Sequence, residues 1–90
     1  MEILAHIDIE EMIIGAFCYL HKNMEFGDFE VMCQKAFKSK DSTVRDCVGL
    51  AIARIDDPLY IPIIKSAIEN ESIVELAEDL NKVLIQLECK

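Results

Sequence analysis

Apolar residues recur every three to four positions along most of the chain, which is the spacing of one face of an amphipathic helix. Ile9, Ile13 and Phe17 illustrate this spacing near the start of the chain. No segment alternates apolar and polar residues with the period of two that is typical of a half-buried strand. Five segments with the helical period are separated by short turns, and they predict helices at about 8–23, 28–38, 42–55, 58–69 and 72–88. The pattern therefore predicts an all-α fold in a single domain over residues 1–90.

Several residues at the predicted helix starts are good caps. Asp8 and Ser72 each stand three residues before a glutamate, which is the spacing of a capping box. Asp57 and Pro58 predict an N-cap followed by a proline at the first helical position. Apolar residues also continue the first pattern back to Glu2, so the start of that helix is left open between Glu2 and Asp8.

The third predicted helix is apolar on almost all sides. Gly49 and Ala53 occupy much of the side opposite its main apolar stripe, and Leu50 lies off that stripe. A helix of this kind is normally covered by several neighbours, and an interior glycine otherwise costs about 1 kcal/mol relative to alanine. We therefore expect the helix at 42–55 to be the centre of the fold, with Gly49 and Ala53 allowing a neighbouring helix to approach closely.

Residues 29–80 contain an internal repeat. Residues 29–37 align with 60–68 at an offset of 31, and residues 41–50 align with 71–80 at an offset of 30. A period of this length with two helices in each unit indicates helical hairpins, which bury their apolar faces by stacking on one another.

A family resemblance follows from the stretch at 44–68. It contains, in order, Val44-Arg45, Cys47, Ile52-Ala53-Arg54-Ile55-Asp56-Asp57-Pro58 and Ile61-Pro62-Ile63-Ile64. This order resembles the short HEAT-like repeat of the phycobilisome-lyase type, in which Val-Arg and alanines precede Leu-Gly-Arg-Ile-Gly-Asp-Pro and Val-Pro-x-Leu. The chain departs from that pattern at Ala53 and Asp56, where glycine is favoured, and at Glu75, where a second arginine is expected. The resemblance implies a right-handed α-α superhelix of about five helices, built from two to three HEAT-like helical hairpins.

The charge of the chain limits its partners. Seventeen acidic and nine basic residues give a net charge of −8, and both halves of the chain are acidic. Because such a field repels phosphate backbones, the composition argues against a nucleic-acid partner. It favours a basic protein partner.

The apolar segments and the cysteines indicate a cytoplasmic protein. The longest apolar run, residues 12–20, has nine residues and is too short to span a bilayer, so no membrane partner is expected. Cys18, Cys33, Cys47 and Cys89 form no CxxC motif, and we interpret them as free thiols in a reducing compartment.

The sequence offers little to support catalysis. Cys18 and His21 would supply only two of the ligands that a metal site needs, and no orienting group for a nucleophile pair is evident. Their reactive or metal role is left open, with a core cysteine beside a helix-end histidine as the simpler interpretation. Arg45 and Arg54 are expected to bond acids or carbonyls in neighbouring turns. We therefore expect no enzymatic activity, no cofactor and no metal.

The expected function is protein binding through one face of the helical stack. In HEAT-like stacks alternate helices line one curved face, which here would be the first, third and fifth. Its outward groups are Glu10, Glu11, Arg45, Asp46, Glu75, Glu78, Asp79 and Lys82. The surface is mostly acidic, so it suits a basic protein partner.

Three alternatives stay open at this stage. A small acidic inhibitor or immunity-type protein could block a basic enzyme through the same charge. The resemblance also allows an accessory subunit of a bilin-lyase-like enzyme. The third alternative is a homodimer, suggested by Val74 and Ile85, which lie off the main apolar stripe of the last helix.

Overall fold

The computed structural model describes residues 9–89, which are almost entirely helical. Along the chain the elements are α2 (Ile9–Asn23), α3 (Phe26–Phe37), α4 (Ser42–Ile55), the 3₁₀ turn η1 (Pro58–Tyr60), α5 (Ile61–Asn70) and α6 (Val74–Glu88). No strand occurs between residues 9 and 89, and the predicted all-α fold is confirmed. The start of the first helix and the predicted cap at Asp8 lie outside the described residues.

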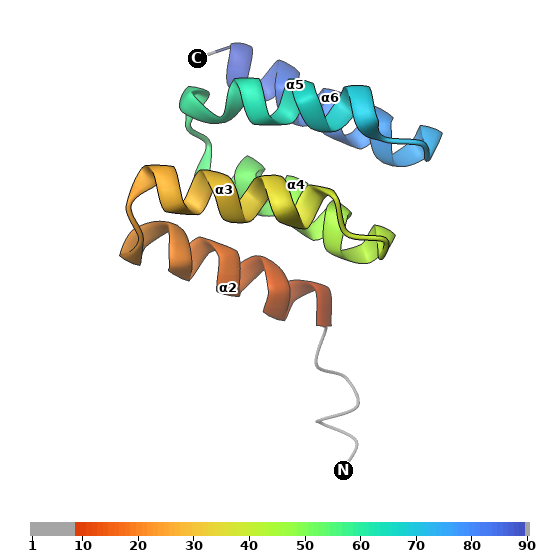
Figure 1. The fold of residues 1–90 in the computed structure, drawn as a ribbon. Coiled ribbons are helices and arrows are strands. Elements are labelled where there is room, and N and C mark those ends of the chain that lie inside the picture. The colour runs from red at the N-terminus through yellow and green to blue at the C-terminus, as the bar shows by residue number, and fades with distance from the viewer. Residues whose placement is uncertain (1–8, 90) are drawn as a thin grey trace.

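The helices stack in tiers (Figure 1). The hairpin of α5 and α6 lies above the hairpin of α3 and α4. Helix α2 lies below and packs against α4. Helix α4 contacts α2, α3 and α6, while α3 also packs on α5. The two segments of the internal repeat thus occupy consecutive tiers, and α2, α4 and α6 follow one another on the same side of the stack.

The prediction that α4 is the centre of the fold is confirmed. Five of its residues are buried, namely Cys47, Val48, Gly49, Ala51 and Ile52. The main core extends from α4 into the facing sides of α3, α5 and α6, where Phe29, Tyr60, Ile64 and Leu80 are almost fully buried. Among helices between residues 9 and 89, none combines the length and apolar character needed to cross a membrane.

Close packing at Gly49 explains the glycine in the middle of α4. A β-carbon built at Gly49 would lie 2.6 Å from Cδ2 of Leu80, which is well inside van der Waals contact. Leu80 belongs to α6 and is 2% exposed, so its side chain has little room to move away. The predicted close approach of a neighbouring helix at this glycine is confirmed.

Substitution of Gly49 by alanine is expected to lower the free energy of unfolding by about 1 kcal/mol. Overpacking against Leu80 costs roughly 1–3 kcal/mol, which exceeds the gain of about 1 kcal/mol in helix propensity. Gly15→Ala on α2 is the matched control, because a β-carbon there meets no atom within 4 Å. Urea denaturation should show Gly15→Ala stabilising the protein and Gly49→Ala destabilising it; equal shifts of the same sign would contradict the packing argument.

The starts of α3, α5 and α6 differ from the predicted positions. Helix α3 begins at Phe26, because Gly27 is accommodated in its first turn and the Phe26 ring packs on Tyr60 with centroids 5.3 Å apart. Asp57 accepts a hydrogen bond from the Leu59 N–H as predicted, but Pro58 opens a 3₁₀ turn and the α-helix follows from Ile61.

The predicted capping box of the last helix is wrong. Helix α6 begins at Val74, and its N-cap residue Ile73 makes no side-chain cap bond. The Ile73 N–H instead donates to Oε2 of Glu71 at 3.1 Å, which places a carboxylate ahead of the helix start in place of Ser72. The reason is tertiary, because Glu71 is held in position by an arginine of the preceding tier.

Candidate functional site

Four of the eight predicted surface residues meet around one hollow. Glu10 from the first turn of α2, Asp46 from α4, and Glu75 and Asp79 from α6 line a depression of about 220 Å³, together with Ser42, Thr43, Ile73 and Leu76. We call this depression the acidic groove. Its carboxylates are far apart in sequence and come together because α2, α4 and α6 follow one another along the stack.

The Asp46 and Asp79 carboxylates of the acidic groove repel each other. Partial burial raises the pKa of the Asp46 carboxyl, and the negative charge of Asp79 raises it further. Lys82 lies 3.8 Å from Oδ1 of Asp79, but both side chains are well exposed, so this pair offsets little of the negative field. The acidic groove is therefore a place where an added positive charge would relieve an existing cost.

Arg45 has a structural role inside the stack. Its Nε donates to Oε1 of Glu71 at 2.8 Å, its Nη2 to Oε2 of Glu71 at 3.1 Å, and its Nη1 to the Ser39 carbonyl at 2.7 Å. The side chains of Arg45 and Glu71 are 13% and 2% exposed. Arg45 thus bonds an acid and a carbonyl as expected, but the acid is 26 positions away and not in a neighbouring turn. Its engaged guanidinium is not available to the proposed partner surface.

The remaining predicted residues lie outside the acidic groove. Glu11 accepts a hydrogen bond from Nη2 of Arg54 at 2.6 Å, an exposed ion pair that joins α2 to α4. Arg54 thus bonds an acid as expected, but this acid is 43 positions away on another helix and not in a neighbouring turn. Glu78 and Lys82 are exposed on α6 and do not line the hollow.

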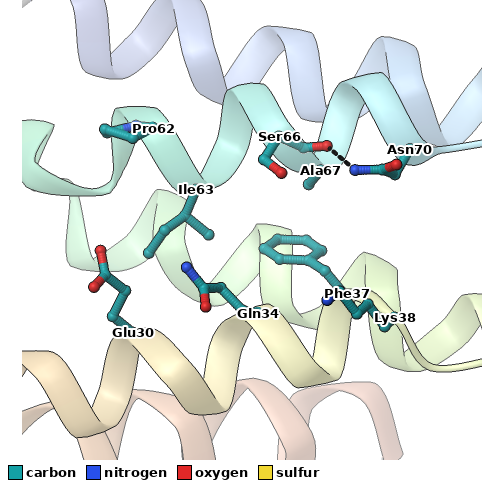
Figure 2. A pocket seen from close by; sticks show the side chains of 9 residues that line it. All are labelled: Glu30, Gln34, Phe37, Lys38, Pro62, Ile63, Ser66, Ala67 and Asn70. Carbon is teal, nitrogen blue, oxygen red and sulfur yellow. Dashed lines mark hydrogen bonds between the residues drawn. The ribbon is translucent and has the colours of Figure 1, made fainter.

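A second hollow lies between α3 and α5, and the sequence analysis did not anticipate it. Figure 2 shows its lining, which encloses about 330 Å³. Phe37 and Ile63 point into the hollow, with Glu30 at one end and Lys38 at the other. The groups around it are Glu30, Gln34, Lys38, Ser66 and Asn70, of which Asn70 donates to the Ser66 carbonyl at 2.9 Å. The internal repeat could have indicated this hollow, since it implies that the first helices of the two hairpins lie side by side.

The side chains of Cys18 and His21 contact different neighbours. The His21 ring lies edge-on to Phe29 and Tyr60, with centroids 5.3 and 5.8 Å apart, while Cys18 is half-buried beside the small cluster around Ile14. Within residues 9–89, no three histidine, cysteine or acidic side chains are arranged to hold a metal ion.

The cysteines are free thiols, and two of them are buried. Burial, with a smaller contribution from Glu30, raises the pKa of the Cys33 thiol to about 12. Cys33 is therefore protonated at neutral pH and a poor nucleophile. Cys47 is fully buried, and its thiol lies 3.8 Å from the Glu10 carbonyl.

Comparisons with protein-family models, curated proteins and solved structures find no match for this chain. Its chemistry must therefore be inferred from the surfaces themselves. The acidic groove offers several carboxylates around a shallow depression and suits recognition of a cation, whereas the hollow between α3 and α5 carries charges of both signs.

Proposed function

We propose that this protein is a non-catalytic interaction module, a small HEAT-like scaffold or adaptor of the cytoplasm, which binds a basic protein through the acidic groove. The observation that carries the proposal is the convergence of Glu10, Asp46, Glu75 and Asp79 from three helices around one hollow. The stacking of α2, α4 and α6 on one side supports the HEAT-like interpretation, because such stacks bind partners along one row of helices.

The size of the acidic groove favours a side chain of a protein as its occupant. Its volume of about 220 Å³ is below the ~300–1,000 Å³ of pockets that enclose small-molecule ligands. A lysine or arginine from a partner could enter it while the surrounding acids face other basic residues. A cation placed there would also reduce the repulsion that raises the pKa of Asp46. Binding of this kind is expected to weaken as salt concentration rises.

Charge reversal in the acidic groove is expected to abolish binding of a basic probe. The double variant Glu75→Lys with Asp79→Lys should weaken binding of a fluorescent octalysine peptide by about tenfold or more, because each reversal replaces an attraction with a repulsion. Fluorescence anisotropy at low salt measures the affinity.

The matched control changes the same net charge elsewhere on the surface. Glu69 and Glu88 are exposed and do not line the acidic groove. Glu69→Lys with Glu88→Lys should weaken octalysine binding by only about twofold, through the overall field. Equal losses in the two double variants would show that only net charge matters, and the proposed site would be wrong.

A further inference from the structure

Helix α2 is apolar on two opposite sides, and only one of them is packed. Its inner side places Ile14, which is 2% exposed, against α4. On the outer side Ile9, Met12 and Tyr19 are 68%, 60% and 65% exposed, and Ala16 between them is also exposed. We call Ile9, Met12, Ala16 and Tyr19 the outer stripe. No residue of the described range 9–89 covers it, and Figure 1 shows α2 at the edge of the stack.

The spacing of the outer stripe is the same when counted from either end of the helix. Its steps are three, four and three residues, which keeps all four side chains on one face of the helix. Two antiparallel copies of α2, related by a twofold axis on the outer side and level with position 14 along the helix, would pair Met12 with Ala16 and Ile9 with Tyr19. Each contact then sets a larger side chain against a smaller one, as close packing requires. The small side chain of the exposed Ala16 near the axis would let the two helices approach closely.

The charges on α2 also favour an antiparallel copy of the same helix. Residues 12–20 contain no aspartate, glutamate, lysine, arginine or histidine. Glu10 and Glu11 lie in the first turn, while His21 and Lys22 lie in the last. An antiparallel arrangement opposes the two helix dipoles and brings the acidic first turn of each helix towards Lys22 in the last turn of the other.

We propose that the outer stripe is the interface of a homodimer in which two α2 helices pack antiparallel. This inference does not depend on the proposed function, because the outer stripe and the acidic groove share no residue. Val74 and Ile85 on α6 are exposed as well, but Glu78 lies between them on that face and makes it a poorer apolar interface. A 15-residue helix is only about 22 Å long, so the interface is small and the dimer is weak.

Sedimentation velocity over micromolar to millimolar concentrations tests the dimer with the full chain. The weight-average mass should rise from 10.2 kDa towards twice that value. Added salt should strengthen the dimer, because each copy carries a net charge of −8. The response is opposite to that expected for a basic probe in the acidic groove, so the two proposals can fail separately.

Complementary variants test the pairing itself. Met12→Lys and Ala16→Glu should each be monomeric, because the two copies of the introduced charge then lie only about 6 Å apart along the helix direction, on either side of the twofold axis. An equimolar mixture of these two variants should recover a heterodimer, since Lys and Glu occupy facing positions. Circular dichroism should show that both variants keep the helical content and melting temperature of the parent, because the substituted residues are exposed.

Val74→Lys and Ile85→Lys are the matched controls and should leave the dimer unchanged. The proposal is overturned if the parent chain stays monomeric throughout, if either control abolishes the dimer, or if the mixture of Met12→Lys and Ala16→Glu stays monomeric. A monomeric parent whose melting temperature falls in Met12→Lys would also overturn it, and would indicate that residues 1–8 of the same chain occupy the outer stripe.

Discussion

Replacement of Leu80 by alanine is expected to lower the free energy of unfolding by about 3–5 kcal/mol. Leu80 is 2% exposed, belongs to the main core and fills the space above Gly49, which has no side chain of its own to collapse into the gap. The loss is a large part of the total free energy of unfolding, which is roughly 5–13 kcal/mol for a domain of this length. Chemical denaturation measures it, with Leu59→Ala as the control, because Leu59 is 62% exposed and its truncation should cost less than about 0.5 kcal/mol.

The same variant reverses the sign of the Gly49→Ala effect. With Leu80 present, a β-carbon at Gly49 clashes with Cδ2 of that side chain. In Leu80→Ala the clashing atom is gone, so Gly49→Ala should stabilise the protein by up to about 1 kcal/mol through helix propensity. An equal cost of Gly49→Ala in both backgrounds would show that the strain at this position has another source.

The second large effect concerns Glu71. Glu71→Ala removes the carboxylate that accepts two hydrogen bonds from Arg45 and one from the Ile73 N–H, and it leaves the Arg45 guanidinium largely buried without its partner. We expect the melting temperature to fall by on the order of 10 °C. The melting temperature of Glu71→Gln should fall less, because the amide oxygen can still accept a hydrogen bond from the Ile73 N–H.

The contribution of Glu71 depends on pH in a defined direction. The hydrogen bond from Arg45 lowers the pKa of the Glu71 carboxyl below its ordinary value of 4.5, and burial only partly opposes this. A carboxyl with a lowered folded pKa stabilises the protein fully above its unfolded pKa and loses that stabilisation as pH falls through the folded pKa. The stability difference between the parent and Glu71→Gln should therefore be constant near neutral pH and shrink below pH 4.5. A difference that stays constant in acid would contradict the ion pair.

Features that depend on neighbouring residues were predictable from the sequence. The predicted bounds of the helix at 42–55 agree with α4, because its apolar periodicity and the Asp57 cap after it are local. The all-α fold and the close approach at Gly49 follow from the same patterns. The acidic groove was predictable in part, because alternate helices of a hairpin stack share a side and four of the eight proposed residues lie on it.

Features that depend on distant residues were not predictable in this way. Glu71 lies 26 positions from Arg45, and nothing in the spacing links the two. That contact explains why Ser72 does not cap α6 and why Arg45 is withdrawn from the partner surface. The hollow between α3 and α5 depends on the distance between these two helices. That distance depends on how side chains such as Phe37 and Ile63 pack, which the sequence pattern does not give.

The bonds of Arg45 also determine how the tiers unfold. Arg45 on α4 joins the Ser39 carbonyl, which precedes α4, to Glu71, which precedes α6. At the other end of the same pair of helices, Gln86 donates to the Ala53 carbonyl and to Asp56, both at 2.8 Å. The two hairpins are thus joined at both ends, so we expect the segment from α3 to α6 to unfold as one cooperative unit even though its sequence is a repeat. Among residues 9–89, helix α2 is joined to that unit by packing on α4 and by the exposed ion pair of Glu11 with Arg54.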